Sequence, residues 1–117
     1  MSNVRNVLRT LRHQWELSQE DVALLLPRSS RDRVSRVERG LTSPNAEEIL
    51  AYRLIFGCSV PKLFPRFYTE TIDTVMQRAY RLNERLQKAT SAMARRKRML
   101  TQQMLERATR KAKRSRI

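Results

Sequence analysis

The side chains best suited to chemistry in this sequence are arginines, and several of them gather in one short stretch. Lysine and arginine number 25 against 11 aspartate and glutamate residues, so the formal net charge is +14. Most of these cations are arginines, and a basic cluster runs from Arg28 to Arg39. A guanidinium group can form two parallel hydrogen bonds with a phosphate or a guanine edge, which an ammonium group cannot do. The composition therefore favours a nucleic-acid partner.

Other reactive side chains are too sparse to build a catalytic site. The sequence holds one histidine and one cysteine, with no glycine-rich phosphate loop and no cluster of carboxylates. His13 stands among polar neighbours, as surface histidines do, and Cys58 has no second cysteine with which to form an internal disulfide. We therefore expect the protein not to be an enzyme, and we expect no cofactor and no metal site.

Apolar segments of the kind that membranes require are also missing. The longest apolar run, Val22 to Leu26, is far shorter than the ~20 residues needed to cross a bilayer. Residues 1–5 lack the apolar stretch of a signal peptide. We expect a cytoplasmic protein that has no membrane partner.

The distribution of glycine and proline divides the chain in two. Both glycines and all four prolines lie within residues 1–65, which is typical of a small domain made of short helices. Residues 66–117 contain neither and carry most of the net positive charge, so one or two long helices are expected there. No alternation of apolar and polar residues marks a strand. The predicted fold class is all-α, with a domain at 1–65 followed by a helical extension at 66–117.

The first two helices are predicted from apolar spacing and a capping signal. Apolar residues from Val4 to Leu11 repeat at helical spacing and indicate a helix over residues 3–14. Ser18 followed by Asp21 predicts a capping box, in which each side chain bonds the backbone N–H of the other residue. The second helix starts there and stops at Pro27.

Two further helices are predicted from the same kind of signal. Ser29 with Asp32 repeats the capping box for a third helix, which ends at Gly40. Asn45 with Glu48 starts a fourth helix after Ser43-Pro44. The remaining expectations are a helix end at Gly57, a single turn from Ser59 to Phe64, and inward-facing side chains at Val22, Leu25, Leu26, Val34, Val37, Ile49, Leu50, Tyr52 and Ile55.

Short helices in this order, with the third beginning in a basic cluster, have the geometry that puts a helix into the major groove of DNA. Over roughly residues 4–64 the sequence resembles the Cro/C1-type (XRE family) helix-turn-helix repressors. The stretches that carry the likeness are Leu17–Ala23 (LSQEDVA), Val34–Gly40 (VSRVERG), Ser43–Pro44 and Phe56–Ser59 (FGCS). The resemblance implies a five-helix, lambda-repressor-like helix-turn-helix domain that binds double-stranded DNA.

The resemblance also implies roles for the matching positions. Gln19 would bond a DNA phosphate, and Arg12 with Glu38 would form an ion pair between the first and third helices. Arg31 and Arg36 would suit O6 and N7 of guanine, and Asp32 would suit N4 of cytosine. The loop after the third helix would lie near phosphates. The full set of expected DNA-binding residues is Gln19, Arg28, Ser30, Arg31, Asp32, Arg33, Arg36, Arg39, Thr42, Ser43 and Asn45.

Some of these residues have a structural alternative. Asp32 is equally suited to complete a capping box without any DNA, and Arg33 and Arg39 are equally suited to remain solvated charges. The turn at 27–30 is one residue longer than the family pattern and lacks its common glycine, so base assignments can shift by one position. Glu16 stands where a glycine often ends the first helix, which suggests a different exit there.

Apolar residues of the second segment fall at the a and d positions of three heptads. These residues are Ile72, Val75, Ala79, Leu82, Leu86, Ala89 and Met93. Pairing with the same helix of a second subunit would bury this seam in a twofold homodimer, with two third helices about 34 Å apart on DNA. The alternative is that the seam packs on its own domain or on a following helix that contains Met99, Leu100 and Met104.

The end of the chain is strongly basic. Its cations are Arg95, Arg96, Lys97, Arg98, Arg107, Arg110, Lys111, Lys113, Arg114 and Arg116, against the single acid Glu106. This tail either contacts phosphates outside the operator, with binding that weakens as salt rises, or is a frayed and solvated end.

The leading prediction is a sequence-specific transcriptional regulator, a repressor that binds a palindromic operator as a homodimer. One alternative is an antitoxin that autoregulates its promoter and uses the extension to bind a toxin or another protein partner. The other is a nonspecific nucleic-acid-binding protein, whose binding changes with salt and not with DNA sequence.

Overall fold

The computed structural model describes the chain from Val7 to Ser115, with side chains up to Arg110. Over these residues the protein contains seven α-helices and no strand, so the all-α prediction is confirmed. Several expectations lie outside the described residues or side chains: the helix over residues 3–6 and the charges of Lys111, Lys113, Arg114 and Arg116.

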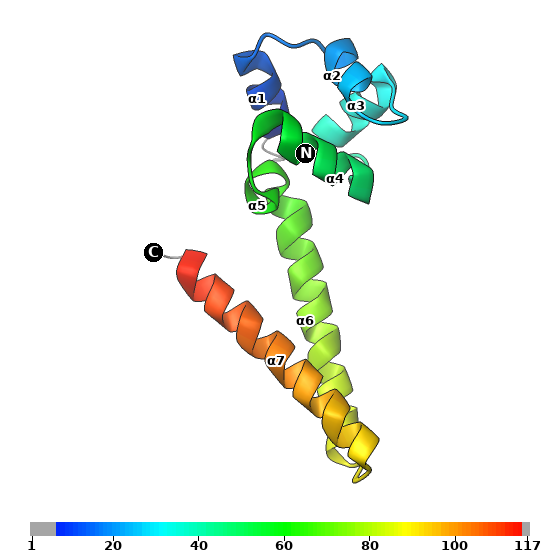
Figure 1. Ribbon diagram of the computed structural model, residues 1–117, viewed down its shortest axis with the longest axis vertical. Helices are drawn as coiled ribbons and strands as arrows, with labels where there is room; N and C mark the ends of the chain where they lie inside the picture. The colour runs from blue at the N-terminus through cyan, green and yellow to red at the C-terminus, as the bar shows by residue number, and fades with distance from the viewer. Residues whose placement is uncertain (1–6, 116–117) are drawn as a thin grey trace. The chain divides into compact units, whose positions relative to one another are not determined.

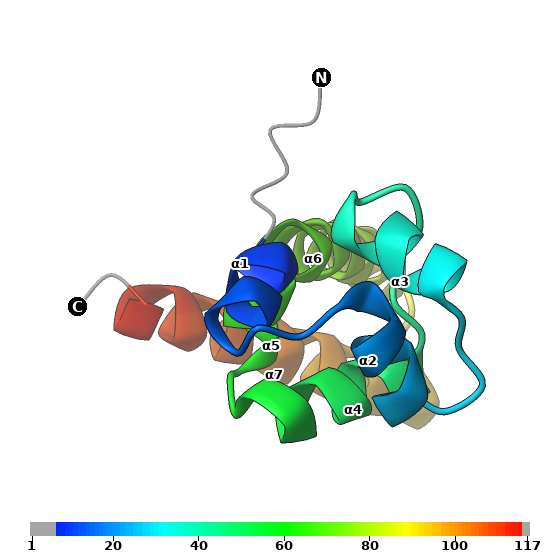
Figure 2. The ribbon, with the colours of Figure 1, turned by 90° about the horizontal axis from the view of Figure 1, so that it is seen from above.

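The helices belong to two compact units, and the boundary between them along the chain lies between Tyr68 and Thr69, close to the predicted one. The first unit contains α1 (Val7–Gln14), α2 (Gln19–Leu25), α3 (Arg31–Glu38), α4 (Ala46–Phe56) and α5 (Val60–Leu63). The second contains most of α6 (Pro65–Gln87) and all of the described part of α7 (Ala92–Ser115), as Figure 1 shows. Within the first unit α2 packs against α3, and α3 follows α2 after a short turn (Figure 2).

Local capping explains where two helices of the first unit begin. At the start of α2, Oγ of Ser18 accepts from the N–H of Asp21 at 3.0 Å, and the Asp21 carboxylate accepts from the N–H of Ser18 at 2.9 Å. These hydrogen bonds hold the pKa of Asp21 below its ordinary value. Asn45 and Glu48 form the same arrangement at the start of α4, which ends at Gly57 with a left-handed φ of 66°. Both of these predicted capping boxes are confirmed.

The third predicted capping box is wrong by one residue. The N-cap of α3 is Ser30, whose Oγ accepts from the N–H of Arg33 at 3.1 Å. Asp32 is therefore the second helical residue, too early in the helix to complete a box. Oγ of Ser29 is buried and has no hydrogen-bond partner among the described residues.

Among the described residues other than glycine, two adopt the left-handed conformation that glycine favours. Arg28 has a φ of 50°, so the turn between α2 and α3 is made without the glycine common in the family pattern. Glu16 has a φ of 54° just after α1. This is a conformation that glycine adopts more readily than glutamate, and the expectation of a different exit from the first helix stays a prediction.

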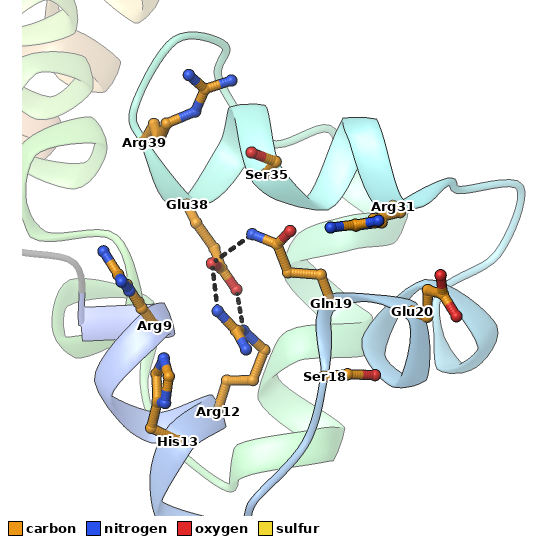
Figure 3. Close-up of a pocket in the computed structure, with 10 residues that line it drawn as sticks. All are labelled: Arg9, Arg12, His13, Ser18, Gln19, Glu20, Arg31, Ser35, Glu38 and Arg39. Atoms are coloured by element: carbon orange, nitrogen blue, oxygen red, sulfur yellow. Dashed lines mark hydrogen bonds and ion pairs between the residues drawn. The ribbon is translucent and has the colours of Figure 1, made fainter.

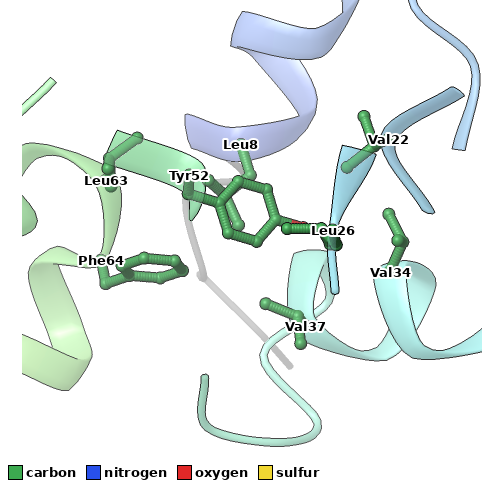
Figure 4. Close-up of a cluster of buried hydrophobic side chains, with 8 residues drawn as sticks. All are labelled: Leu8, Val22, Leu26, Val34, Val37, Tyr52, Leu63 and Phe64. Carbon is green, nitrogen blue, oxygen red and sulfur yellow. The ribbon is translucent and has the colours of Figure 1, made fainter. Parts of the chain in front are cut away.

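One cluster of apolar side chains holds the first unit together (Figure 4). At its centre is Tyr52 of α4, which is 1% exposed and lies against the rings of Phe56 and Phe64, with ring centroids 6.2 and 5.6 Å away. Burial raises the pKa of the Tyr52 hydroxyl well above its ordinary value. The other buried members are Leu8, Val22, Leu26, Val34, Val37 and Leu63.

Most of the predicted core is observed, with two exceptions. Ile49 and Ile55 are half-buried at the edge of the cluster. Leu25 and Leu50 are 55% and 63% exposed, so their predicted inward orientation is wrong. Each is adjacent in sequence to a more buried residue, and one step along a helix turns the side chain by about 100°, away from the core.

The second unit is a helical hairpin in which α7 turns back along the end of α6 (Figure 1). Arg98 of α7 satisfies the C-terminal end of α6, since its Nη1 donates to the carbonyl oxygen of Leu86 and, at 2.8 Å, to that of Ala89. The hydroxyl of Thr101 donates to Oδ1 of Asn83 at 3.0 Å. These bonds join the two helices near the turn at residues 88–91.

This turn divides the predicted apolar seam. The seam residues from Ile72 to Leu86 lie on α6, whereas Ala89 lies in the turn and Met93 lies on α7. Ala79 is buried, but Ile72, Val75 and Leu82 are 38%, 43% and 43% exposed, and Met93 is 67% exposed. The prediction that the seam runs along one helix is therefore wrong, because the chain reverses after Gln87. A following helix is present, yet its Met99 and Leu100 are 62% and 54% exposed.

Candidate nucleic-acid interface

The arginine-bearing face of α3 is open to solvent along the whole helix. Val34 and Val37 point into the core, at 0% and 6% exposure. Because side chains turn by about 100° per residue, the residues between them in sequence point elsewhere. The exposed side chains of α3 and its flanks are Arg28, Ser30, Arg31, Asp32, Arg36 and Arg39.

A buried ion pair fixes the C-terminal end of α3 (Figure 3). Nε of Arg12 lies 2.6 Å from Oε2 of Glu38, and Nη2 lies 3.1 Å from Oε1. Arg12 also donates from Nη1 to the carbonyl oxygen of Leu17 at 3.0 Å. The ion pair expected between α1 and α3 is thus present and nearly excluded from water, with both residues under 10% exposed: Arg12 at 8% and Glu38 at 4%.

Gln19 joins this network from α2. Its Nε2 donates to Oε1 of Glu38 at 3.2 Å, and the side chain is half-buried. The residue expected at a DNA phosphate therefore has its amide nitrogen turned toward a carboxylate of its own chain. One carboxylate, that of Glu38, thereby holds α1, α2 and α3 together.

A second ion pair fixes α3 to α4. Nε and Nη2 of Arg33 lie 2.7 and 2.6 Å from the two carboxylate oxygens of Glu48, which is 2% exposed. Arg33 also donates to Oγ1 of Thr42 and to the carbonyl oxygen of Ser43, both at 3.2 Å. The hydrogen bonds from Arg33, with a further one from the N–H of Asn45, hold the pKa of Glu48 below its ordinary value.

These contacts correct the interpretation of Arg33 and of the loop after α3. Arg33 is not a solvated charge, because it makes four hydrogen bonds within the domain. Thr42 and Ser43 accept from Arg33, and the Asn45 side chain caps α4. Arg33 and this loop therefore support α3, and their expected DNA contacts stay predictions.

Asp32 and Arg36 form an exposed ion pair on the outer face of α3. Oδ2 of Asp32 lies 2.7 Å from Nη2 of Arg36, and the two side chains are 70% and 56% exposed. A pair this exposed contributes little to stability. Either partner can therefore exchange it for another contact at small cost.

A hollow of about 670 Å³ lies between α1, α2 and α3 (Figure 3). Exposed arginines, Arg9, Arg31 and Arg39, stand around it, and its deeper carboxylate, Glu38, is neutralised by Arg12. Its other lining residues are His13, Ser18, Gln19, Glu20 and Ser35. The hollow presents positive charge to solvent, which suits an anionic group such as a phosphate.

Arg9 and His13 are site residues that the sequence-based prediction missed. Together with Arg12 they follow a spacing of three and four residues along α1, so all three share one face of that helix. The assignment of Arg12 to an ion pair with α3 was enough to show that this face of α1 turns toward the candidate interface.

Comparison with known protein families, curated proteins and solved structures gives no match for this chain. Among the described residues, no group of histidine, cysteine, aspartate or glutamate is arranged to hold a metal ion. No helix in the described part of the chain has the length and apolar character needed to cross a membrane. The geometry of α3 and its surroundings therefore carries the functional proposal.

Proposed function

We propose that this protein is a sequence-specific DNA-binding transcriptional regulator of the Cro/C1 (XRE) type, a repressor that binds a palindromic operator as a homodimer. The observation that carries the proposal is α3, which two ion pairs tie to α1 and α4 while its opposite face offers arginines to solvent. A firmly held helix with exposed cations meets the requirement for insertion into the major groove, which is about 12 Å wide. In this proposal residues 1–65 are a five-helix, lambda-repressor-like domain whose helix-turn-helix is α2 and α3.

Base recognition comes from the outer face of α3. The guanidinium groups of Arg31 and Arg36 can each donate two hydrogen bonds to O6 and N7 of a guanine. Asp32 can accept from N4 of a cytosine, or it can orient Arg36 through their 2.7 Å contact. Since that pair is exposed, little stability is lost when a base replaces one partner.

Phosphate contacts come from the cations around the hollow. Arg9 and Arg39 are exposed at its edge, and Arg28 and Ser30 are exposed in the turn before α3. Contacts of this kind fix the orientation of a protein on the duplex and carry no sequence information. Contacts of this kind would let a domain with few base contacts bind firmly at low salt.

The homodimer is proposed from the second unit. Its fully buried side chains among the described residues are small ones, Ala79, Ala94 and Thr101, and larger ones such as Leu86 and Leu105 are only half-buried. A hairpin that buries so little apolar surface gains little stability from its own packing. Ile72, Val75 and Leu82 lie on the side of α6 that also carries the buried Ala79, and they remain exposed beside α7. A second copy would bury them in a contact that closes on itself.

Selection of bound sequences from random DNA tests the proposal. The full chain is mixed with random duplexes at a fixed salt concentration, and the retained sequences are determined. We expect a palindromic motif whose half-sites are about one helical turn apart. Equal retention of all sequences, with binding that responds only to salt, would contradict the proposal and favour the nonspecific alternative.

A further inference from the structure

Four of the six α7 cations whose side chains are described lie on one face of the helix, and Lys97 and Arg98 point elsewhere. The helix continues through the basic tail to Ser115, so the described part of this tail is helical. At about 100° per residue, the side chains of Arg95, Arg96, Arg107 and Arg110 fall within an arc of about 120°. All four are exposed, and they are called the arginine face here.

The arginine face lies opposite the side of α7 that packs on α6. Ala94 and Thr101 are 5% and 1% exposed, and Leu105 and Ala108 are half-buried on the same side. Packing on α6 therefore leaves the arginine face uncovered within this unit. The described ion pairs include none of its four arginines, and the single acid on this part of the helix is Glu106.

We propose that the arginine face is a second DNA-binding surface, which holds the phosphate backbone of double-stranded DNA regardless of base sequence. The choice of DNA rests on the function proposed for α3. At a rise of 1.5 Å per residue, the pair Arg95–Arg96 and the pair Arg107–Arg110 are about 20 Å apart along the helix. The major groove is about 12 Å wide, so the two pairs can reach phosphates on both of its edges.

Other anionic partners fit this face less well. A helix that lies on a membrane surface needs apolar side chains beside its cations. The exposed large apolar side chains of α7, Met93, Met99 and Leu100, lie within its first turns. The part of the helix that carries Arg107 and Arg110 has none among the described residues. An acidic protein remains a partner to be tested, because carboxylates also bind guanidinium groups.

The test compares two variants of the full chain that lose equal charge. The first carries Arg95→Gln, Arg96→Gln, Arg107→Gln and Arg110→Gln. The control carries Arg78→Gln, Arg81→Gln, Arg85→Gln and Lys88→Gln, which are exposed positions of α6 and of the turn. Glutamine is a good helix former, so both variants keep their helices, which circular dichroism checks.

Affinity for a duplex of scrambled sequence is measured by fluorescence anisotropy over a range of salt concentrations. Each phosphate contact contributes about 0.9 to the slope of log K against log salt, so we expect the slope of the first variant to fall by about 3 to 4. In the control we expect the slope to fall by less than about 1. Double variants at Arg95 and Arg96, or at Arg107 and Arg110, are expected to lose about half as much each.

An unchanged slope in the first variant, or an equal fall in both, would overturn the inference. Displacement of the duplex by polyglutamate as readily as by unlabelled DNA would also overturn it, in favour of an acidic protein. Failure of the proposed function gives a different result, which is equal affinity for the selected and scrambled duplexes. Substitutions on the arginine face should leave the ratio of the two affinities, for the selected and for the scrambled duplex, unchanged. Phosphate contacts support both complexes alike.

Discussion

Arg33 and Arg36 carry the same side chain within one turn of α3, yet their surroundings differ. Arg33 faces the buried carboxylate of Glu48, whereas Arg36 contacts the exposed Asp32. A buried carboxylate that loses its partner is left without water or counter-charge, which is costly. An exposed pair can be replaced by water at almost no cost. In the proposed function, Arg33 supports the fold and Arg36, three residues further along α3, recognises a base.

Arginine-to-alanine substitutions at these two positions are expected to affect different properties, the stability of the fold and the preference for a base. Arg33→Ala should lower the free energy of unfolding by about 2 to 3 kcal/mol, less than for a fully buried pair because Arg33 is 30% exposed. Arg36→Ala should change the free energy of unfolding by less than about 0.5 kcal/mol. It should weaken the preference for the correct base at one operator position by about 1 to 3 kcal/mol. Urea denaturation measures the first quantity, and anisotropy with mutated duplexes measures the second.

Each variant is the control for the other, since both remove one positive charge from α3. Equal losses of stability would contradict the assignment of Arg33 to the support of the helix. Unchanged base preference in Arg36→Ala would contradict its assignment to base recognition.

Glu48 also makes stability depend on pH. Its pKa in the folded protein lies below the ordinary value near 4.5, because Arg33 and the N–H of Asn45 stabilise the ionised form. The folded state thus binds protons less readily than the unfolded state. This contribution is fully present above about pH 4.5 and is lost as the pH falls through the lower folded-state value.

Urea midpoints measured from neutral pH down to about pH 3 should therefore decrease most steeply below pH 4.5. Glu48→Gln should flatten part of this decrease while lowering stability at neutral pH. Asp21, whose pKa is lowered by its bonds with Ser18, acts in the same direction and remains in both proteins. An identical pH profile in the variant would show that Glu48 makes no such contribution.

At the scale of the helices, local signals predicted the helix starts, whereas the one long-range contact that was predicted, Arg12 with Glu38, came from the family resemblance. The capping boxes at Ser18 and Asn45 involve residues three apart and were predicted. The start of α3 was misplaced because two serines stand side by side, and the left-handed Arg28 selects the second one. The contact of Arg33 with Glu48 joins residues far apart in sequence and left no local signal.

A following helix was among the alternatives, but the place of the reversal between α6 and α7 was not predicted, for a related reason. No glycine or proline marks residues 88–91, so the heptad spacing ran through the turn without interruption. Arg98 stabilises the reversal from α7 by bonding the carbonyl oxygens of Leu86 and Ala89. A cap supplied by a residue of the next helix cannot be recognised from the residues of the turn alone.

The two serines before α3 provide a test of the cap. Ser30→Ala should lower the free energy of unfolding by about 1 kcal/mol, because the N–H of Arg33 loses its acceptor. Ser29→Ala should be neutral or slightly stabilising, since the buried Oγ of Ser29 makes no hydrogen bond with the described residues. Thermal or urea unfolding of the two variants distinguishes these outcomes. A larger loss in Ser29→Ala would mean that the helix starts one residue earlier, as the sequence first indicated.

At the scale of the whole molecule, the two units differ in how they are stabilised. The first has a core of aromatic and aliphatic side chains around Tyr52 and two ion pairs with buried carboxylates. The second buries small side chains and leaves Ile72, Val75 and Leu82 at the surface of α6. A chain with this distribution is expected to gain stability in its second unit by association, and its stability should then rise with protein concentration.

Leucine-to-glutamine substitutions in the two units test this expectation. Leu82 on α6 is 43% exposed and Leu54 on α4 is 80% exposed, so neither change should unfold the chain. Leu82→Gln combined with Val75→Gln should shift the protein from dimer to monomer, because polar groups would be buried in the contact between copies. Leu54→Gln should leave the dimer intact. Sedimentation equilibrium over a range of concentrations measures the oligomeric state of both variants and of the wild-type chain. A wild-type chain that stays monomeric at every concentration would contradict the homodimer. These apolar residues would then be left to a different protein partner.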